Sequence, residues 1–92
     1  MTLEQIKNIA CKRFNITKEQ LVNGGRKIEV VYAKIAISQI LHKKGYSDAE
    51  ISDSIGMHRT TIIHYLATFK DRLKFDETFK SKFEEFEKDL QQ

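Results

Sequence analysis

The residues of this chain whose types could do chemistry gather just after residue 56. Met57-His58-Arg59-Thr60-Thr61 offers an imidazole, a guanidinium and two hydroxyls, and no carboxylate follows before Asp71. Side chains of these types pair with base edges, and a guanidinium can bind both major-groove acceptors of a guanine. His64 could donate to a phosphate, and a structural role for this histidine is the equal alternative. The pattern predicts a surface that reads DNA.

Two short helices joined by a tight turn would position these side chains. Ser47 and Glu50 match the capping box of a helix start, and two isoleucines follow at a spacing of four. Gly56 comes next, where a left-handed glycine ends a helix at little cost. The stretch of about residues 47–69 is therefore predicted to be a helix-turn-helix, whose second helix enters the major groove. The inward stripe of that second helix is predicted to be Ile62, Ile63, Leu66 and Phe69.

Length and composition indicate a single all-α domain. Ninety-two residues leave room for one hydrophobic core, so we treat residues 1–92 as one domain. The chain has no proline and only four glycines, which favours helices, and we expect five or six of them. Ile28 to Val31 could begin a strand, but the sequence offers no partner strand.

Three helices are predicted before the motif from apolar spacing and capping signals. The first covers residues 2–14, and the second covers residues 17–22 and starts with the capping box of Thr17 and Gln20. The third, residues 28–44, has the broadest apolar face and is predicted to be the central, most buried helix.

A last helix is predicted after the motif. A charged segment, residues 70–74, is expected to leave the second helix of the motif, and Asp76 is the candidate N-cap of the next helix. Core packing is the favoured explanation for the apolar face of this last helix, and a partner groove or a dimer seam is the alternative. That face consists of Phe79, Phe83, Phe86 and Leu90.

A basic loop precedes the central helix. Asn23-Gly24-Gly25 leads into Arg26-Lys27, without the lysine-serine sequel of a nucleotide-binding loop. Such cations could reach a minor groove or phosphates, and solvated loop charge is the alternative. The net charge of +3 is uneven: residues 1–45 hold nine lysines and arginines against three acids, and residues 76–92 hold three against six. The acidic end is expected to face away from a polyanion.

Other kinds of site are not expected. The three histidines stand sixteen and six residues apart, which fits no metal-ligand spacing, so we expect no metal, no cofactor, no small-molecule substrate and no catalysis. Cys11 is the single cysteine, which suits a reducing cytoplasm. No segment is apolar enough for a membrane span or a signal peptide.

The segment Gly56 to His64 resembles the signature of the C-terminal DNA-binding domain of the bacterial replication initiator DnaA, roughly G-G-R-D-H-[ST]-T-[VI]-x-H. One glycine, both threonine positions, the branched aliphatic residue and the histidine match, whereas His58-Arg59 replaces the Asp-His pair. Upstream, Arg26-Lys27 resembles the basic loop of the family, and Ser47 to Ile51 resembles its S-L-x-E-I-G segment. The resemblance covers about residues 3–91.

The resemblance implies a DNA-binding role in replication initiation or its regulation. It implies a recognition helix in the major groove and the basic loop at the minor groove. The expected major-groove contacts are His58, Arg59, Thr60 and Thr61, with Arg26 in the minor groove. The expected phosphate contacts are Lys27, Lys34, Ser47, the backbone of Ala49, and His64.

The sequence leaves open whether the chain is part of a larger protein. The ATPase module of full-length initiators is not in this sequence, so we expect an excised domain or, given Met1, a free-standing relative in the bacterial nucleoid or encoded by a phage or mobile element. The alternatives are a helical protein-interaction module, with a protein partner or self-association through the phenylalanine-rich helix, a transcriptional regulator, and the DNA-binding part of a mobile-element protein such as a transposase.

Overall fold

Six helices and the short connections between them make up the fold. The computed structural model describes residues 1–91, and those residues contain no strand. The all-α prediction is therefore confirmed, with six helices. They are α1 (Leu3–Arg13), α2 (Lys18–Asn23), α3 (Ile28–Lys43), α4 (Asp48–Ile55), α5 (Arg59–Phe75) and α6 (Glu77–Leu90).

Local side-chain caps fix where most of these helices begin. The Thr17 hydroxyl accepts from the backbone N–H of Gln20 at 3.0 Å, and the Gln20 side chain accepts from the N–H of Thr17 at 2.9 Å. Ser47 and Glu50 make the same reciprocal pair at 3.2 and 3.1 Å. Both predicted capping boxes are confirmed, because each depends only on residues three apart in the sequence.

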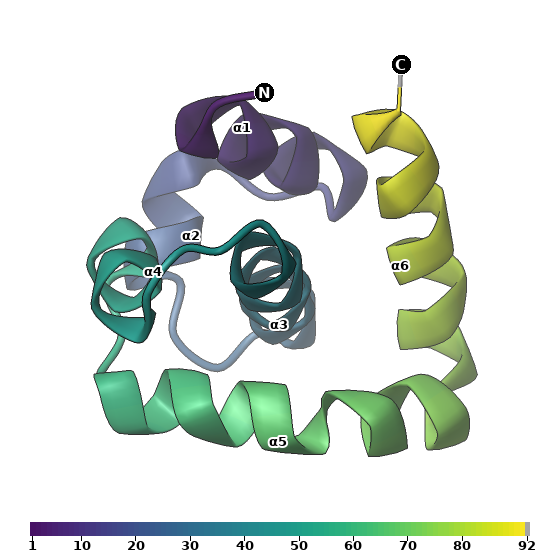
Figure 1. Ribbon diagram of the computed structural model, residues 1–92. Coiled ribbons are helices and arrows are strands. Elements are labelled where there is room, and N and C mark those ends of the chain that lie inside the picture. Colours follow the sequence, from purple (N-terminus) through teal and green to yellow (C-terminus); the bar gives the residue numbers. More distant parts are fainter. Residues whose placement is uncertain (92) are drawn as a thin grey trace.

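Helix α3 lies at the centre of the molecule, and α1, α4, α5 and α6 frame it (Figure 1). Ten of its sixteen residues are buried. A helix that is apolar on nearly every side needs neighbours on nearly every side, which explains why this segment takes the central place. The prediction of a central, most buried helix is confirmed.

The phenylalanine face of α6 packs into the core. Phe79, Phe83 and Phe86 are 0%, 4% and 0% exposed. Phe83 contacts Phe69 of α5 edge-to-face with ring centroids 4.9 Å apart. Core packing, the favoured explanation for this face, is confirmed for the three rings, and Leu90 is half-buried against the same core.

Helix α5 is longer than predicted. Residues 70–74 were expected to leave the helix, but they are helical and α5 ends at Phe75. Two contacts explain the error. Leu73 continues the inner stripe one turn beyond Phe69 and packs on the core, and Arg72 pairs with Asp76 at 3.5 Å.

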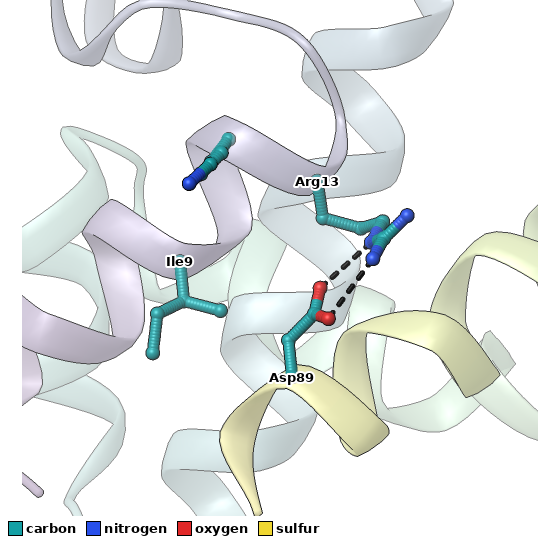
Figure 2. Close-up of a pocket in the computed structure, with 4 residues that line it drawn as sticks. Ile9, Arg13 and Asp89 are labelled. Carbon is teal, nitrogen blue, oxygen red and sulfur yellow. Dashed lines mark hydrogen bonds and ion pairs between the residues drawn. The ribbon is translucent and has the colours of Figure 1, made fainter. Parts of the chain in front are cut away.

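The two ends of the fold are joined by an ion-pair cluster. Arg13 at the end of α1 donates from Nε and Nη2 to both carboxylate oxygens of Asp89 on α6, at 2.7 and 2.9 Å (Figure 2). Its Nη1 donates to Glu85 at 2.8 Å. The carboxylate of Asp89 borders a hollow of about 420 Å³, and because both of its oxygens accept from Arg13 it is a structural group rather than a free acid.

Candidate nucleic-acid interface

The turn between α4 and α5 has the predicted shape. Gly56 is left-handed, with φ 65° and ψ 34°, and its N–H bonds to the carbonyl of Ser52. A methyl group at Gly56 would come within 2.9 Å of Val22 Cγ1, so the turn also packs against the end of α2. The prediction of two helices joined by a tight turn at Gly56 is confirmed.

Helix α5 starts differently from most of the others. Helices α1, α2, α4 and α6 each begin with a hydroxyl or carboxylate that accepts a backbone N–H. His58 at the N-cap of α5 makes no such bond, and the first turn contains no acid. The first N–H groups of a helix have no partner within it and carry partial positive charge. With Arg59 beside them, they form a positive surface that suits an anion.

The first two turns of α5 hold most of the predicted base contacts together. His58, Arg59 and Thr60 are exposed, and Thr61 is half-buried. His64 is exposed one turn after Thr60, so these two side chains share the outer face of the helix. The arrangement offers donors, acceptors and a guanidinium on the outer surface of one helix end.

The helix that precedes the basic loop approaches the turn before α5. Arg26 and Lys27 are exposed, and Lys27 is the N-cap of α3 without a side-chain cap bond. Gly24 closes α2 with an N–H bond to the carbonyl of Gln20. The contact of Val22 with Gly56 sets the end of α2 against the α4–α5 turn. The loop therefore begins close to the turn that leads into α5.

The start of α4 offers two predicted phosphate contacts. Ser47 is exposed, and its hydroxyl, which accepts from Glu50, still has a proton to donate. Ala49 is half-buried in the first turn of α4, where backbone N–H groups are free of helical partners. Asp48 and Glu50 flank it and would oppose a phosphate, so any contact here is expected to run through the backbone.

Lys34 lies apart from the other predicted residues. It is only 5% exposed, and its Nζ donates to the thioether of Met57 at 3.2 Å. Burial lowers the pKa of this ammonium below its ordinary value. In this conformation the ammonium lies behind the α4–α5 turn rather than on the surface. Its predicted phosphate contact therefore stays a prediction, and it would require the Met57 side chain to turn aside.

The prediction that Ile63 faces the core is wrong. This residue was assigned to the inward stripe of α5, but it is 54% exposed, whereas Ile62 is 0% exposed. The inner stripe is Ile62, Leu66, Phe69 and Leu73. Successive helix residues point about 100° apart, and with Ile62 at the centre of the inner side Ile63 points toward solvent. The spacing of the inner stripe was the signal that could have found it.

The remaining groups that could serve other kinds of site can be located among residues 1–91. No group of three or more histidines, cysteines and acids there could hold a metal ion. Cys11 is buried, which raises the pKa of its thiol above the ordinary value. No helix in the same part of the chain is long and apolar enough to cross a membrane.

Two curated relatives match the chain along almost its whole length. Each is 29% identical over 89 residues, which cover 95% of this chain. They are the chromosomal replication initiator proteins DnaA of Bacteroides thetaiotaomicron and Bacteroides fragilis. The chain is similar to the replication initiator DnaA. This finding confirms the resemblance predicted from residues 56–64 and from the basic loop.

The similarity covers only a part of DnaA. The chain spans 19% of the length of each of these DnaA proteins, which is consistent with one domain of the initiator. No family model matches the chain, and no solved structure matches it significantly.

Proposed function

We propose that this chain binds double-stranded DNA sequence-specifically and acts in replication initiation or its regulation. The observation that carries the proposal is the start of α5, an uncapped helix end with no acid in its first turn, where His58, Arg59 and Thr60 are exposed. Backbone N–H groups, a guanidinium and hydroxyls are the groups that proteins use on phosphates and base edges.

The proposed complex has the first two turns of α5 in the major groove and the Arg26-Lys27 loop at the neighbouring minor groove. The contact of Val22 with Gly56 supports this arrangement because it holds the base of the loop beside the turn. The similarity to two replication initiators supports the place in replication. The chain acts as a binding module without catalysis of its own, in the bacterial cytoplasm.

The charge of the molecule favours one orientation on DNA. Figure 1 shows α6 at the opposite end of α5 from its first turn. The C-terminal residues 76–92, which include α6, hold six acids against three lysines. Because α5 has 17 residues and is about 25 Å long, the acidic helix stays more than a Debye length from a duplex at the start of α5.

Selection of bound duplexes from random DNA at two salt concentrations tests the proposal. We expect an enriched motif whose affinity exceeds that of random DNA by at least about 10³-fold. Arg59→Ala should reduce the enrichment and relax the preference at one base pair of the motif, whereas Lys80→Ala, which removes an exposed cation of α6, should leave both unchanged. Weak binding that salt abolishes, without any enriched motif, would contradict the proposal.

A further inference from the structure

Ile63 is an apolar residue within a polar surface. Its side chain is 54% exposed on the second turn of α5. Arg59 precedes it by four residues and Thr60 by three, so both are its neighbours on the helix surface, and the exposed His64 follows it directly. Ile63 thus lies among the side chains proposed to contact bases.

The fold does not require an isoleucine at this position. Ile63 is not among the residues of α5 packed on the core, which are Ile62, Tyr65, Leu66, Phe69 and Leu73. The other exposed large apolar residues of the described chain lie elsewhere: at the N-terminus, on α2, at the start of α3 and at the end of α5. They are Met1, Val22, Ile28 and Phe75.

The major groove of DNA displays one apolar group, the C5 methyl of thymine. We propose that Ile63 contacts a thymine methyl in the major groove and so determines part of the sequence preference; this inference rests on the proposed function. A β-branched side chain has a restricted χ1, so its methyl groups hold one position with little loss of entropy. The neighbouring polar groups, from Arg59, Thr60 and His64, keep the helix start in the groove.

The helix geometry also sets where the thymine lies. Ile63 is one turn of α5 beyond Arg59, a separation of about 5.4 Å along the axis. Bases along one strand are about 3.4 Å apart. If Arg59 binds a guanine, the thymine read by Ile63 lies within about two base pairs of it, on either strand.

Replacement of single thymines by uracil tests this inference. Uracil keeps the O4 acceptor and the base pairing and lacks only the methyl. In the duplex selected by the wild-type protein, one thymine near the guanine should weaken binding about three- to fivefold when it becomes uracil, as expected for one buried methyl. With Ile63→Ala, the same replacement should have no effect.

Phe75→Ala provides the matched control. It also removes an exposed apolar side chain of α5, 76% exposed, but at the far end of the helix. The uracil scan of this variant should equal that of the wild type. Circular dichroism and thermal unfolding should show that both variants keep their fold, because neither side chain is part of the core.

5-Methylcytosine carries the same methyl, so a second scan replaces each cytosine by it. If methylation of a cytosine raises the affinity and no replacement of thymine by uracil lowers it, Ile63 does not read a thymine methyl, and the inference is overturned. Uracil effects that persist in Ile63→Ala, or a selected site without thymine near the guanine, would also overturn it and leave sequence-specific binding intact. If no duplex is enriched at all, the proposed function itself fails.

Discussion

At the scale of single residues, Arg59 is expected to carry the largest part of the sequence discrimination. Its exposed guanidinium can make two parallel bonds to a guanine. Arg59→Ala should weaken binding to the selected duplex by about 1–3 kcal/mol and weaken binding to random DNA much less. Fluorescence anisotropy titrations on both duplexes measure the difference.

Arg59→Lys is the informative companion of this variant. A lysine keeps the charge but lacks the planar fork of donors. It should bind random DNA like the wild type and still lose preference for the guanine. Equal losses on all sequences for Arg59→Ala would contradict a base-reading role and leave only an electrostatic one.

The buried ammonium of Lys34 is expected to lower the stability of the fold, and it is a predicted phosphate contact in DNA binding. Because burial lowers its pKa, the charged form is disfavoured in the folded state, and this destabilisation fades as the pH rises through the folded-state pKa. Lys34→Met should therefore raise the free energy of unfolding near neutral pH by about 1 kcal/mol. Urea unfolding measures this change, and a loss of stability would contradict it.

The same variant reports on the predicted phosphate contact of Lys34. If the ammonium reaches a phosphate, Lys34→Met should weaken binding to all sequences alike and reduce the slope of log affinity against log salt by about one. Lys80→Met removes an exposed charge distant from the start of α5 and should change neither the affinity nor the slope.

At the scale of elements, the turn between α4 and α5 depends on Gly56 for two reasons. An alanine there would adopt a left-handed conformation, which costs about 1–2 kcal/mol, and its methyl would also press on Val22. Gly25 has a similar φ of 70° and no atom within 4 Å of an added methyl. Gly56→Ala should therefore destabilise more than Gly25→Ala, by about 0.5–1 kcal/mol.

A double variant separates the two effects. Val22→Ala removes the atom that the new methyl would meet. In the Val22→Ala background, Gly56→Ala should therefore reduce the free energy of unfolding only as much as Gly25→Ala does in the wild type. Equal free energies of unfolding for Gly56→Ala and Gly25→Ala would contradict the packing contribution. The contact between α2 and the turn would then not hold the basic loop in place.

The sequence predicted those elements whose signals are local. The capping boxes at Thr17 and Ser47, the glycine turn and the Asp76 cap each involve residues only a few positions apart, and the structure has all of them. The errors depend on contacts with distant residues. The extension of α5 depends on packing of Leu73 and on Asp76, and the burial of Lys34 depends on Met57, twenty-three residues away.

The candidate site was predictable as a list of residues but not as a surface. The exposed positions on α5 and on the basic loop agree with the residue types that suggested them. The exposure of Ile63 could not be read from the pair of adjacent isoleucines alone, and only the spacing of Ile62 with Leu66, Phe69 and Leu73 distinguishes the two. The approach of α2 to the turn depends on the Val22 contact, for which the sequence has no periodic signal.

At the scale of the whole molecule, Asp76 joins three helices. Its carboxylate accepts from the hydroxyl of Tyr32 on α3 at 2.6 Å and caps α6 by accepting from the N–H of Phe79 at 3.1 Å. It also pairs with Arg72 of α5. The Tyr32 hydroxyl and then the Phe79 N–H are the main reasons why the pKa of Asp76 lies below its ordinary value.

This lowered pKa makes the fold sensitive to acid. A carboxyl group whose pKa is lower in the folded state stabilises above its unfolded pKa of about 4, and the contribution is lost as the pH falls through the folded-state pKa. Asp76→Ala should reduce the free energy of unfolding by about 1–2 kcal/mol near neutral pH, and the reduction should shrink in acid. Urea unfolding across the pH range measures it.

Tyr32→Phe is the matched variant. It keeps the ring that packs on Phe79, with centroids 5.3 Å apart, and removes only the hydroxyl. Its free energy of unfolding should fall less steeply than that of the wild type as the pH drops into the acid range. The change has the same sign as for Asp76→Ala but is smaller. A constant difference from wild type at every pH would contradict the role assigned to this hydrogen bond.

One face of the molecule, formed by the start of α5 and the basic loop, is proposed to meet DNA. Titration of the isotope-labelled protein with its selected duplex, followed by amide NMR shifts, tests this claim most directly. We predict the largest shifts at residues 24–27 and 57–64, and almost none along α6. Shifts concentrated on α6, or spread evenly over the exposed lysines, would contradict the claim and indicate another surface or a generic charge effect.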